Sequence, residues 1–219
     1  MASLRRAAVI ALLLAGSLLV SAVALAGEPP LEQKRLRPAD MALAKQTTLR
    51  GSDLSPAWRR QTPEKPRNEL PTCPGVDMDF SAFTITGQAS SAFALSAATI
   101  DSRVEVFKSR SDASRDFRKA TTAPVLRCVG RWLRQELAKE LPGARVISSR
   151  LLSRPKVGER AILYRLVMEV QSGAGPIRVF VDLLGFQRGR THVTLTSGSP
   201  NAPTRGLLSV ARSVAARAR

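Results

Sequence analysis

The chain has 219 residues, which suits one domain with a sizeable core plus an additional segment and is short for two domains. Its 34 Lys and Arg against 17 Asp and Glu give a formal net charge of +17, which predicts attraction to anionic surfaces. The arginines are spread along the chain, aromatic residues make up only 5% of it, and no nucleic-acid recognition motif is present. We therefore expect no nucleic-acid partner.

The first 26 residues are predicted to be an export signal. Arg5 and Arg6 precede an uncharged run that closes on Ala-Leu-Ala at Ala26. This pattern is typical of a signal peptide cleaved between Ala26 and Gly27. The run is also about 20 residues long, so an uncleaved membrane anchor is the alternative. In either case the rest of the chain is predicted to lie outside the inner membrane, in contact with it only through this segment if uncleaved.

Cys73 and Cys128 are the two cysteines of the chain. In an exported protein, one disulfide between them is the simplest prediction, with a stabilising role worth about 4 kcal/mol in the entropic model. A redox-active or metal-binding pair would favour the close spacing Cys-x-x-Cys, which this chain does not have.

The chain is predicted to divide into a signal peptide (1–26), a tether with one short helix (27–52) and a domain (53–219). Prolines and charges dominate the start of the tether, and Asp40 is expected to cap its helix. The one-residue spacing of Asp77 and Asp79 begins some calcium-binding loops, but the later ligands of such a loop do not follow, which favours a solvated turn.

The domain is predicted to contain a single antiparallel sheet. Alternation of apolar and polar residues indicates strands at 83–95, 99–107, 146–152, 161–170, 177–186 and 191–196. Helical spacing indicates one helix capped by Ser111, a second restarted at Pro124 and continuing to about residue 141, and a third over 204–218. We expect an α+β fold in which about five or six strands carry helices on one face.

His192 is the only histidine, and its place beside a turn predicts a surface position. A Ser-His-Asp hydrolase would need it as the base, and no Gly-x-Ser-x-Gly elbow accompanies it. With one histidine and two bonded cysteines, the chain also offers no metal site by spacing.

Other catalytic or ligand patterns are weak. Gly173 and Gly175 precede a strand, whereas a phosphate-binding glycine loop leads into a helix. Carboxylates distant in the sequence can form an acid pair for glycoside cleavage, but solvated or salt-bridged positions are the favoured interpretation for Glu105, Glu136, Glu159, Glu169 and Asp182. We therefore predict no catalytic residue, no metal ligand and no cofactor, and we assign no ligand-binding residue.

One order of residues spans a little over half the chain, from Cys73 to Arg190: an extended Val104-Glu105-Val106-Phe107, Ala113 and Phe117 on a helix, Cys128, and a Gly189-Arg190 turn. This order resembles that of a family of secreted actinobacterial domains, the PknH-type extracellular sensor group. That group is similar in turn to LpqN-like lipoproteins with a PsbP-like α+β sandwich. The sensor domains typically have two disulfides, and the lipoproteins carry a lipid-modified cysteine where this chain has Gly27. The resemblance implies the fold and a non-catalytic binding role.

We thus predict an exported, non-catalytic binding or sensor-like domain at the bacterial cell envelope. Its partner would be a small ligand or an envelope component held in a groove between sheet and helices, and the net positive charge favours an anionic one. The alternatives are a hydrolase that acts on envelope material and a structural protein bound electrostatically to anionic cell-surface polymers.

Overall fold

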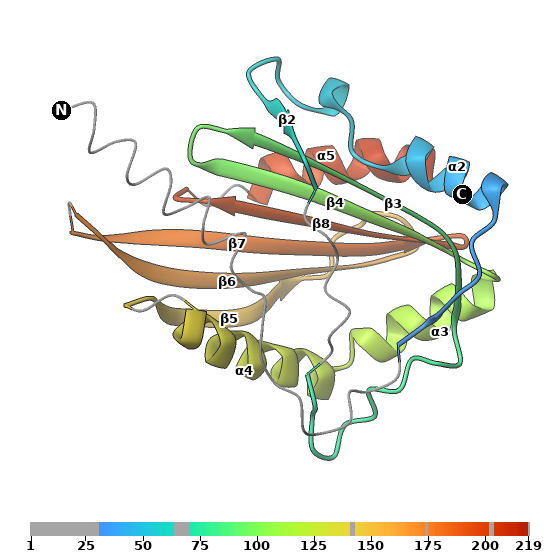
Figure 1. Cartoon of the computed structure of the whole chain (residues 1–219), viewed down its shortest axis with the longest axis horizontal. Helices are drawn as coiled ribbons and strands as arrows, with labels where there is room; N and C mark the ends of the chain where they lie inside the picture. The colour runs from blue at the N-terminus through green and yellow to red at the C-terminus, as the bar shows by residue number, and fades with distance from the viewer. Residues whose placement is uncertain (1–30, 64–70, 141–142, 174, 202–203, 219) are drawn as a thin grey trace.

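The computed structural model describes residues 31–63, 71–140, 143–173, 175–201 and 204–218 (Figure 1). The predicted signal segment, with its cleavage site at Ala26 and Gly27, lies outside these residues.

Eight strands in the described residues form one sheet, in the order β1-β3-β4-β8-β7-β6-β5, with β2 also paired to β3. The strands are β1 (Gln33–Lys34), β2 (Arg59–Gln61), β3 (Thr84–Leu95), β4 (Ala98–Phe107), β5 (Arg145–Ser153), β6 (Arg160–Ser172), β7 (Gly175–Arg188) and β8 (Thr191–Ser199). β1 runs parallel to β3, and the other pairs are antiparallel, so the sheet is mixed. The prediction of five or six antiparallel strands was wrong, because β1 and β2 are too short to produce an alternating pattern.

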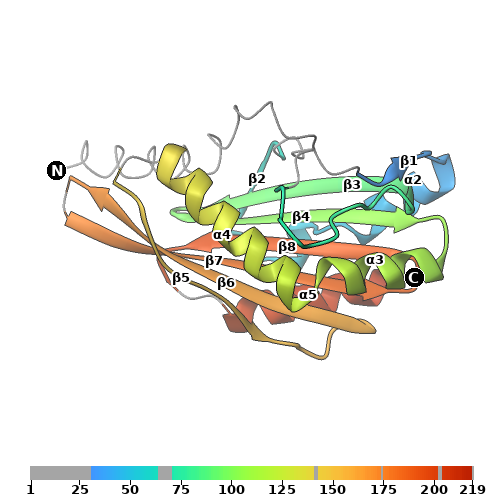
Figure 2. The same ribbon diagram turned by 90° about the horizontal axis from the view of Figure 1, so that it is seen from below.

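Helices cover both faces of the sheet (Figures 1 and 2). They are α2 (Pro38–Thr47), α3 (Arg110–Ala120), α4 (Ala123–Glu140) and α5 (Thr204–Arg217), with a 3₁₀ turn, η1, at Gly51–Asp53. α2 and α5 lie on one face, and α3 and α4 lie on the other. The prediction of helices on one face was therefore also wrong. Alternating charged residues such as Arg103 and Glu105 of β4 are typical of a face open to water, but Glu105 lies opposite His192 of β8, whose side chain contacts α3.

Each face has its own apolar core. Under α2 and α5, alternate residues of the central strands form the larger cluster, which includes Val104, Val106, Leu184, Phe186, Val193, Leu195, Leu207, Ala211 and Val214. Under α3 and the start of α4, a second cluster contains Cys73, Phe80, Phe83, Phe107, Ala113, Val125 and Cys128. The strands are thus buried on both sides where helices cross them, which stabilises the sheet over most of its width.

The described part of the predicted tether (27–52) packs against the sheet. Ala44 of α2 is fully buried in the larger core. Asp40 does not cap this helix, because the helix already begins at Pro38. Asp40 instead accepts hydrogen bonds from Arg190, with 2.8 Å between Arg190 Nη2 and Asp40 Oδ1. Asp53 likewise binds Arg217 of α5 at 2.7 Å, so ion pairs join the two ends of the described chain.

The start of α3 also differs from the prediction by two residues. Ser109 is its N-cap, and the Ser109 side chain accepts a hydrogen bond from the backbone N–H of Asp112 at 3.0 Å. Ser111 lies inside the first turn. Both residues are serines followed by a helical pattern, so the sequence alone does not distinguish them.

Gly87 of β3 allows α2 to approach the sheet closely. A β-carbon at this position would overlap the backbone carbonyl of Asp40. We expect Gly87→Ala to lower the free energy of unfolding by about 1–3 kcal/mol, because the helix backbone must move. Gly206→Ala is the matched control: nothing lies within 4 Å of its added methyl group on α5, and alanine favours a helix by about 1 kcal/mol. Urea unfolding of both variants checks this, and equal effects would contradict the close approach.

Candidate functional site

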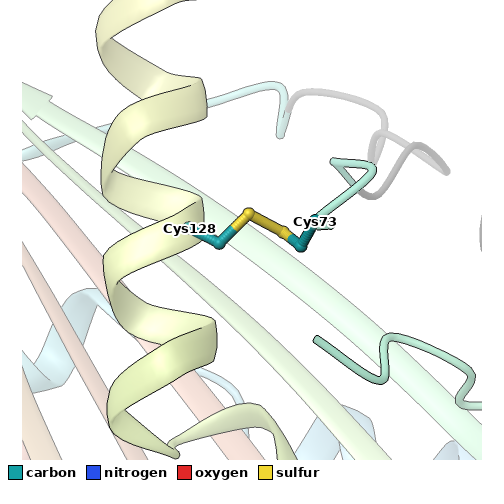
Figure 3. Close-up of a disulfide and its surroundings, with 2 residues drawn as sticks. All are labelled: Cys73 and Cys128. Carbon is teal, nitrogen blue, oxygen red and sulfur yellow. A yellow bond between two sulfur atoms is a disulfide. The ribbon is translucent and has the colours of Figure 1, made fainter. Parts of the chain in front are cut away.

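α4 is held tightly against the edge of the sheet by two features. The disulfide between Cys73 and Cys128, with 5.9 Å between their Cα atoms, joins α4 to the segment before β3 and confirms the predicted pairing (Figure 3). Gly130 faces the hydrogen-bonded pair Ser149 and Tyr164, and a β-carbon there would come within 2.5 Å of the Tyr164 hydroxyl. α4 therefore has a fixed position over β5 and β6, and so do the side chains on its outer side.

The outer side of α4 carries a row of arginines. Arg127, Arg131 and Arg134 follow the i, i+4, i+7 spacing that places residues on one face of a helix. Together with Arg150 of β5 and Arg154 after it, they line a pocket of about 380 Å³, which we call the arginine pocket. The remaining lining residues are Ala123, Leu126, Ser149, Leu151 and Tyr164. The pocket therefore combines five cations with an apolar and hydroxyl-bearing floor.

The described residues do not neutralise the charge of this pocket. Arg127, Arg131, Arg134, Arg150 and Arg154 form no ion pair with any residue in the described ranges. All five are exposed. Like charges gathered at one concave place repel one another and create a positive potential there. An anion bound among them would relieve this repulsion, and the planar fork of each guanidinium suits a carboxylate or a phosphate.

A second pocket, the loop pocket, adjoins the first. Its volume is about 400 Å³, and its lining runs from the end of α3 across the β5–β6 connection. Arg118, Lys156 and Arg160 line it together with Arg154, which also lines the arginine pocket. Its one acidic residue, Glu159, is already bound by Arg110 at 3.1 Å and by the backbone N–H of Gly189 at 3.0 Å. The two pockets form one basic region, which contrasts with the scattered arginines of the linear sequence.

His192 is not at the surface, contrary to the prediction. Its side chain is only 11% exposed and lies 4.5 Å from the ring of Phe107 and 5.4 Å from that of Phe117, measured between centroids. Its Nε2 lies 2.6 Å from the backbone carbonyl oxygen of Ala113, and its Nδ1 lies 3.0 Å from Asp116 Oδ2. Both ring nitrogens are therefore engaged in holding α3 on the sheet.

This geometry assigns a proton to one ring nitrogen of His192. A carbonyl oxygen only accepts hydrogen bonds, so Nε2 carries a proton. Nδ1 then either donates to an ionised Asp116 or accepts from a protonated one. Burial raises the pKa of Asp116, and the hydrogen bond from His192 opposes this rise. The pair thus works as a buried structural link with no free nitrogen to act as a base toward a substrate.

Glu32, next to β1, belongs to the same group of charges. Burial raises its pKa from 4.5 to about 7, with further contributions from the nearby charges of Glu105 and Asp116. The folded chain therefore binds the Glu32 proton more tightly than the unfolded chain does. The resulting stabilisation is complete below pH 4.5 and disappears as the pH rises through 7.

We therefore expect Glu32→Gln to stabilise the protein only at high pH. At pH 8 the variant should be more stable by about 1–2 kcal/mol, after allowance for solvent around this half-buried side chain. At pH 4.5 the two proteins should be nearly equal. Thermal unfolding at both values measures the difference, and a gain that does not change with pH would contradict the assigned cause.

The structure places the candidate acidic residues apart and pairs them with cations. Glu105 binds Arg103, Glu159 binds Arg110, Glu169 binds Arg145, and Asp182 binds Arg165. The side chain of Glu136 lies outside the described residues. Of these four, Glu159 lines the loop pocket and none lines the arginine pocket, so neither of these two pockets holds an acid pair drawn from them.

A lysine side chain contacts the Asp77–Asp79 turn. Lys119 binds Asp77 Oδ2 at 2.7 Å and also donates to the backbone carbonyl of Asp79. The lysine ammonium thus pairs with the first of the two carboxylates. Gly173 follows the last residue of β6, and Gly175 is the first residue of β7.

These features describe a domain with helices on both faces of a mixed sheet and a basic region near its β5 edge. The disulfide is typical of extracytoplasmic proteins. Among the described residues, every helix is too short or too polar to cross a bilayer.

Comparisons with known proteins add a distant structural similarity. No protein-family model matches the chain, and no curated protein matches it. Among solved structures, the chain is similar to the X-ray structure of an uncharacterized protein from Mycobacterium smegmatis, described as the Rv0999 ortholog. The TM-score is 0.41 and the sequence identity is 14%, over 82% of this chain and 97% of the other. These values do not assign the chain to a family.

Proposed function

We propose that the chain is an exported, non-catalytic binding domain of the cell envelope that holds an anionic ligand in the arginine pocket. One observation carries the proposal: five arginines line one pocket and form no ion pair within the described residues. Folding alone would favour spreading these charges or pairing them with carboxylates. A bound anion supplies the missing negative charge.

The surroundings of the pocket support binding rather than catalysis. Leu126 and Leu151 offer apolar contact, and Tyr164 and Ser149 offer hydroxyl groups, which is the mixture found in ligand sites. His192, the only histidine, lines neither of the two described pockets and has both nitrogens occupied. The site therefore has donors to hold an anion and no evident group to cleave it.

The proposal also includes the location of the protein and its relationship to known sensor domains. The signal sequence and the disulfide support secretion across the inner membrane. The resemblance to PknH-type sensor and LpqN-like domains supports a sensor-like role, in which occupation of the pocket reports on envelope composition.

The proposal is tested by calorimetric titration of the mature protein with inorganic phosphate. Arg131→Ala/Arg134→Ala should weaken binding about tenfold or more, because each removed guanidinium takes away charge-assisted hydrogen bonds worth about 1.5–3 kcal/mol. The control is Arg35→Ala/Arg60→Ala, which removes the same charge from exposed positions outside both pockets.

The control separates a specific site from general attraction to anions. If the two double variants bind phosphate equally, the positive charge acts as a whole and the alternative of an electrostatic structural protein is favoured. If the parent protein does not bind phosphate, sulfate or a carboxylate at low salt, the proposal is wrong.

A further inference from the structure

We propose that the ligand is a linear chain of phosphoryl groups that spans both pockets, with Arg154 in contact with it at their junction. This inference rests on the proposed function and names the chemical class of its ligand. It follows from three features of the basic region: its continuity, its number of donors and the state of its one acidic residue.

The continuity comes from Arg154. This residue lines both the arginine pocket and the loop pocket, so an anion that occupies one of them lies next to the other. Beyond Arg154, the loop pocket adds Arg118, Lys156 and Arg160. A compact ion such as phosphate would leave these cations without a partner, whereas an extended polyanion would contact both groups.

The number of donors favours phosphoryl groups over carboxylates. A carboxylate has two oxygens and is satisfied by one or two guanidinium groups. Five guanidinium groups surround the arginine pocket, and each presents up to five N–H donors. A phosphoryl group offers more acceptor oxygens, and a chain of them repeats this set at short intervals. A peptide rich in Asp and Glu carries one carboxylate per residue, so it offers fewer acceptor oxygens along its length to match these donors.

Glu159 does not oppose such a ligand. It is the single acidic residue that lines the loop pocket, and it accepts hydrogen bonds from Gly189 and Gln187 and pairs with Arg110. The negative charge of Glu159 is therefore already compensated by these partners. The cations of the loop pocket keep their charge available for an incoming anion.

The inference is tested by the dependence of affinity on chain length. Inorganic phosphate, pyrophosphate, tripolyphosphate and a longer linear polyphosphate are titrated in turn into the mature protein at one fixed ionic strength. We expect affinity to rise at least tenfold once the chain reaches the loop pocket, because the second contact becomes intramolecular. Oligoglutamate of matched charge should bind more weakly than the polyphosphate.

Two variants distinguish a spanning ligand from general attraction between a basic protein and a longer polyanion. Arg118→Ala/Arg160→Ala should abolish most of the gain in affinity with chain length. In this variant the dissociation constant of the longer polyphosphate should approach the dissociation constant of pyrophosphate. Arg35→Ala/Arg60→Ala should keep the gain.

The outcomes separate this inference from the proposed function. Suppose that phosphate binds and that Arg131→Ala/Arg134→Ala weakens its binding. If affinity then does not rise with chain length, or if Arg118→Ala/Arg160→Ala and Arg35→Ala/Arg60→Ala lose this rise equally, the spanning ligand is wrong and the proposed arginine pocket stands. If oligoglutamate binds as tightly as polyphosphate, the phosphoryl class is wrong. If no anion binds the parent protein, both proposals fail.

Discussion

Asp182→Ala is expected to lower the free energy of unfolding by about 3–5 kcal/mol. Asp182 is fully buried in the sheet, and its two carboxylate oxygens each accept a hydrogen bond of 2.6 Å from Arg165. Arg165 is itself 14% exposed, and the hydrogen bonds that it donates to Asp182 raise the pKa of its guanidinium. Removal of the carboxylate leaves this guanidinium charged and deprived of its principal partner in a largely apolar place.

The double variant Arg165→Met/Asp182→Leu is the control for this prediction. It removes both charges and keeps much of the volume, so it should be less destabilised than Asp182→Ala. Chemical denaturation of the parent, Arg165→Met, Asp182→Leu and the double variant gives the coupling energy. A loss below about 1 kcal/mol for Asp182→Ala would show that the pair contributes little.

Loss of the disulfide is expected to have an effect of similar size. Cys73 and Cys128 are 55 residues apart, and release of a loop of this length lowers stability by about 4 kcal/mol in the entropic model. Cys73→Ser/Cys128→Ser should show this loss in urea unfolding. Because the bond also fixes α4, the variant should bind phosphate more weakly at temperatures where it remains folded.

Treatment with a reductant provides the control. It should lower the stability of the parent protein toward that of Cys73→Ser/Cys128→Ser and leave the variant unchanged. If alkylation of the parent protein without reductant labels both cysteines, the bond does not form in solution, and its assigned role would be wrong.

Sequence patterns predicted the longer elements because each has enough residues to show a period. The alternation in β4 and β6 and the helical spacing in α4 and α5 gave bounds within a few residues of the observed ones. The patterns could not predict β1 and β2, which are two and three residues long and exist because the edge strand β3 offers them hydrogen-bonding groups.

The two covered faces were missed for a different reason. α2 has little amphipathic character in its sequence, and it docks through small residues such as Ala44 and the close approach at Gly87. His192 alternates with the buried Val193 along β8, but the face to which His192 points is covered by α3. Its partner Asp116 lies far away in the sequence, so alternation alone could not show that the side chain is buried.

The candidate site was only half visible in the sequence. The spacing of Arg127, Arg131 and Arg134 on one side of α4 indicated a charged helix face, for which exposure to solvent is the usual interpretation. Arg150 and Arg154 come from the edge strand and the loop after it. Only the packing of α4 over β5 brings the two sets together, and no local pattern predicts that contact.

The most direct test of the central claim is a map of the binding site by two-dimensional NMR during titration with pyrophosphate. The account predicts that the largest chemical-shift changes occur in α4 around Arg127–Arg134 and in residues 149–154, and that they saturate. Small changes spread evenly over the basic surface, or changes centred on His192 and Asp116 instead, would contradict it.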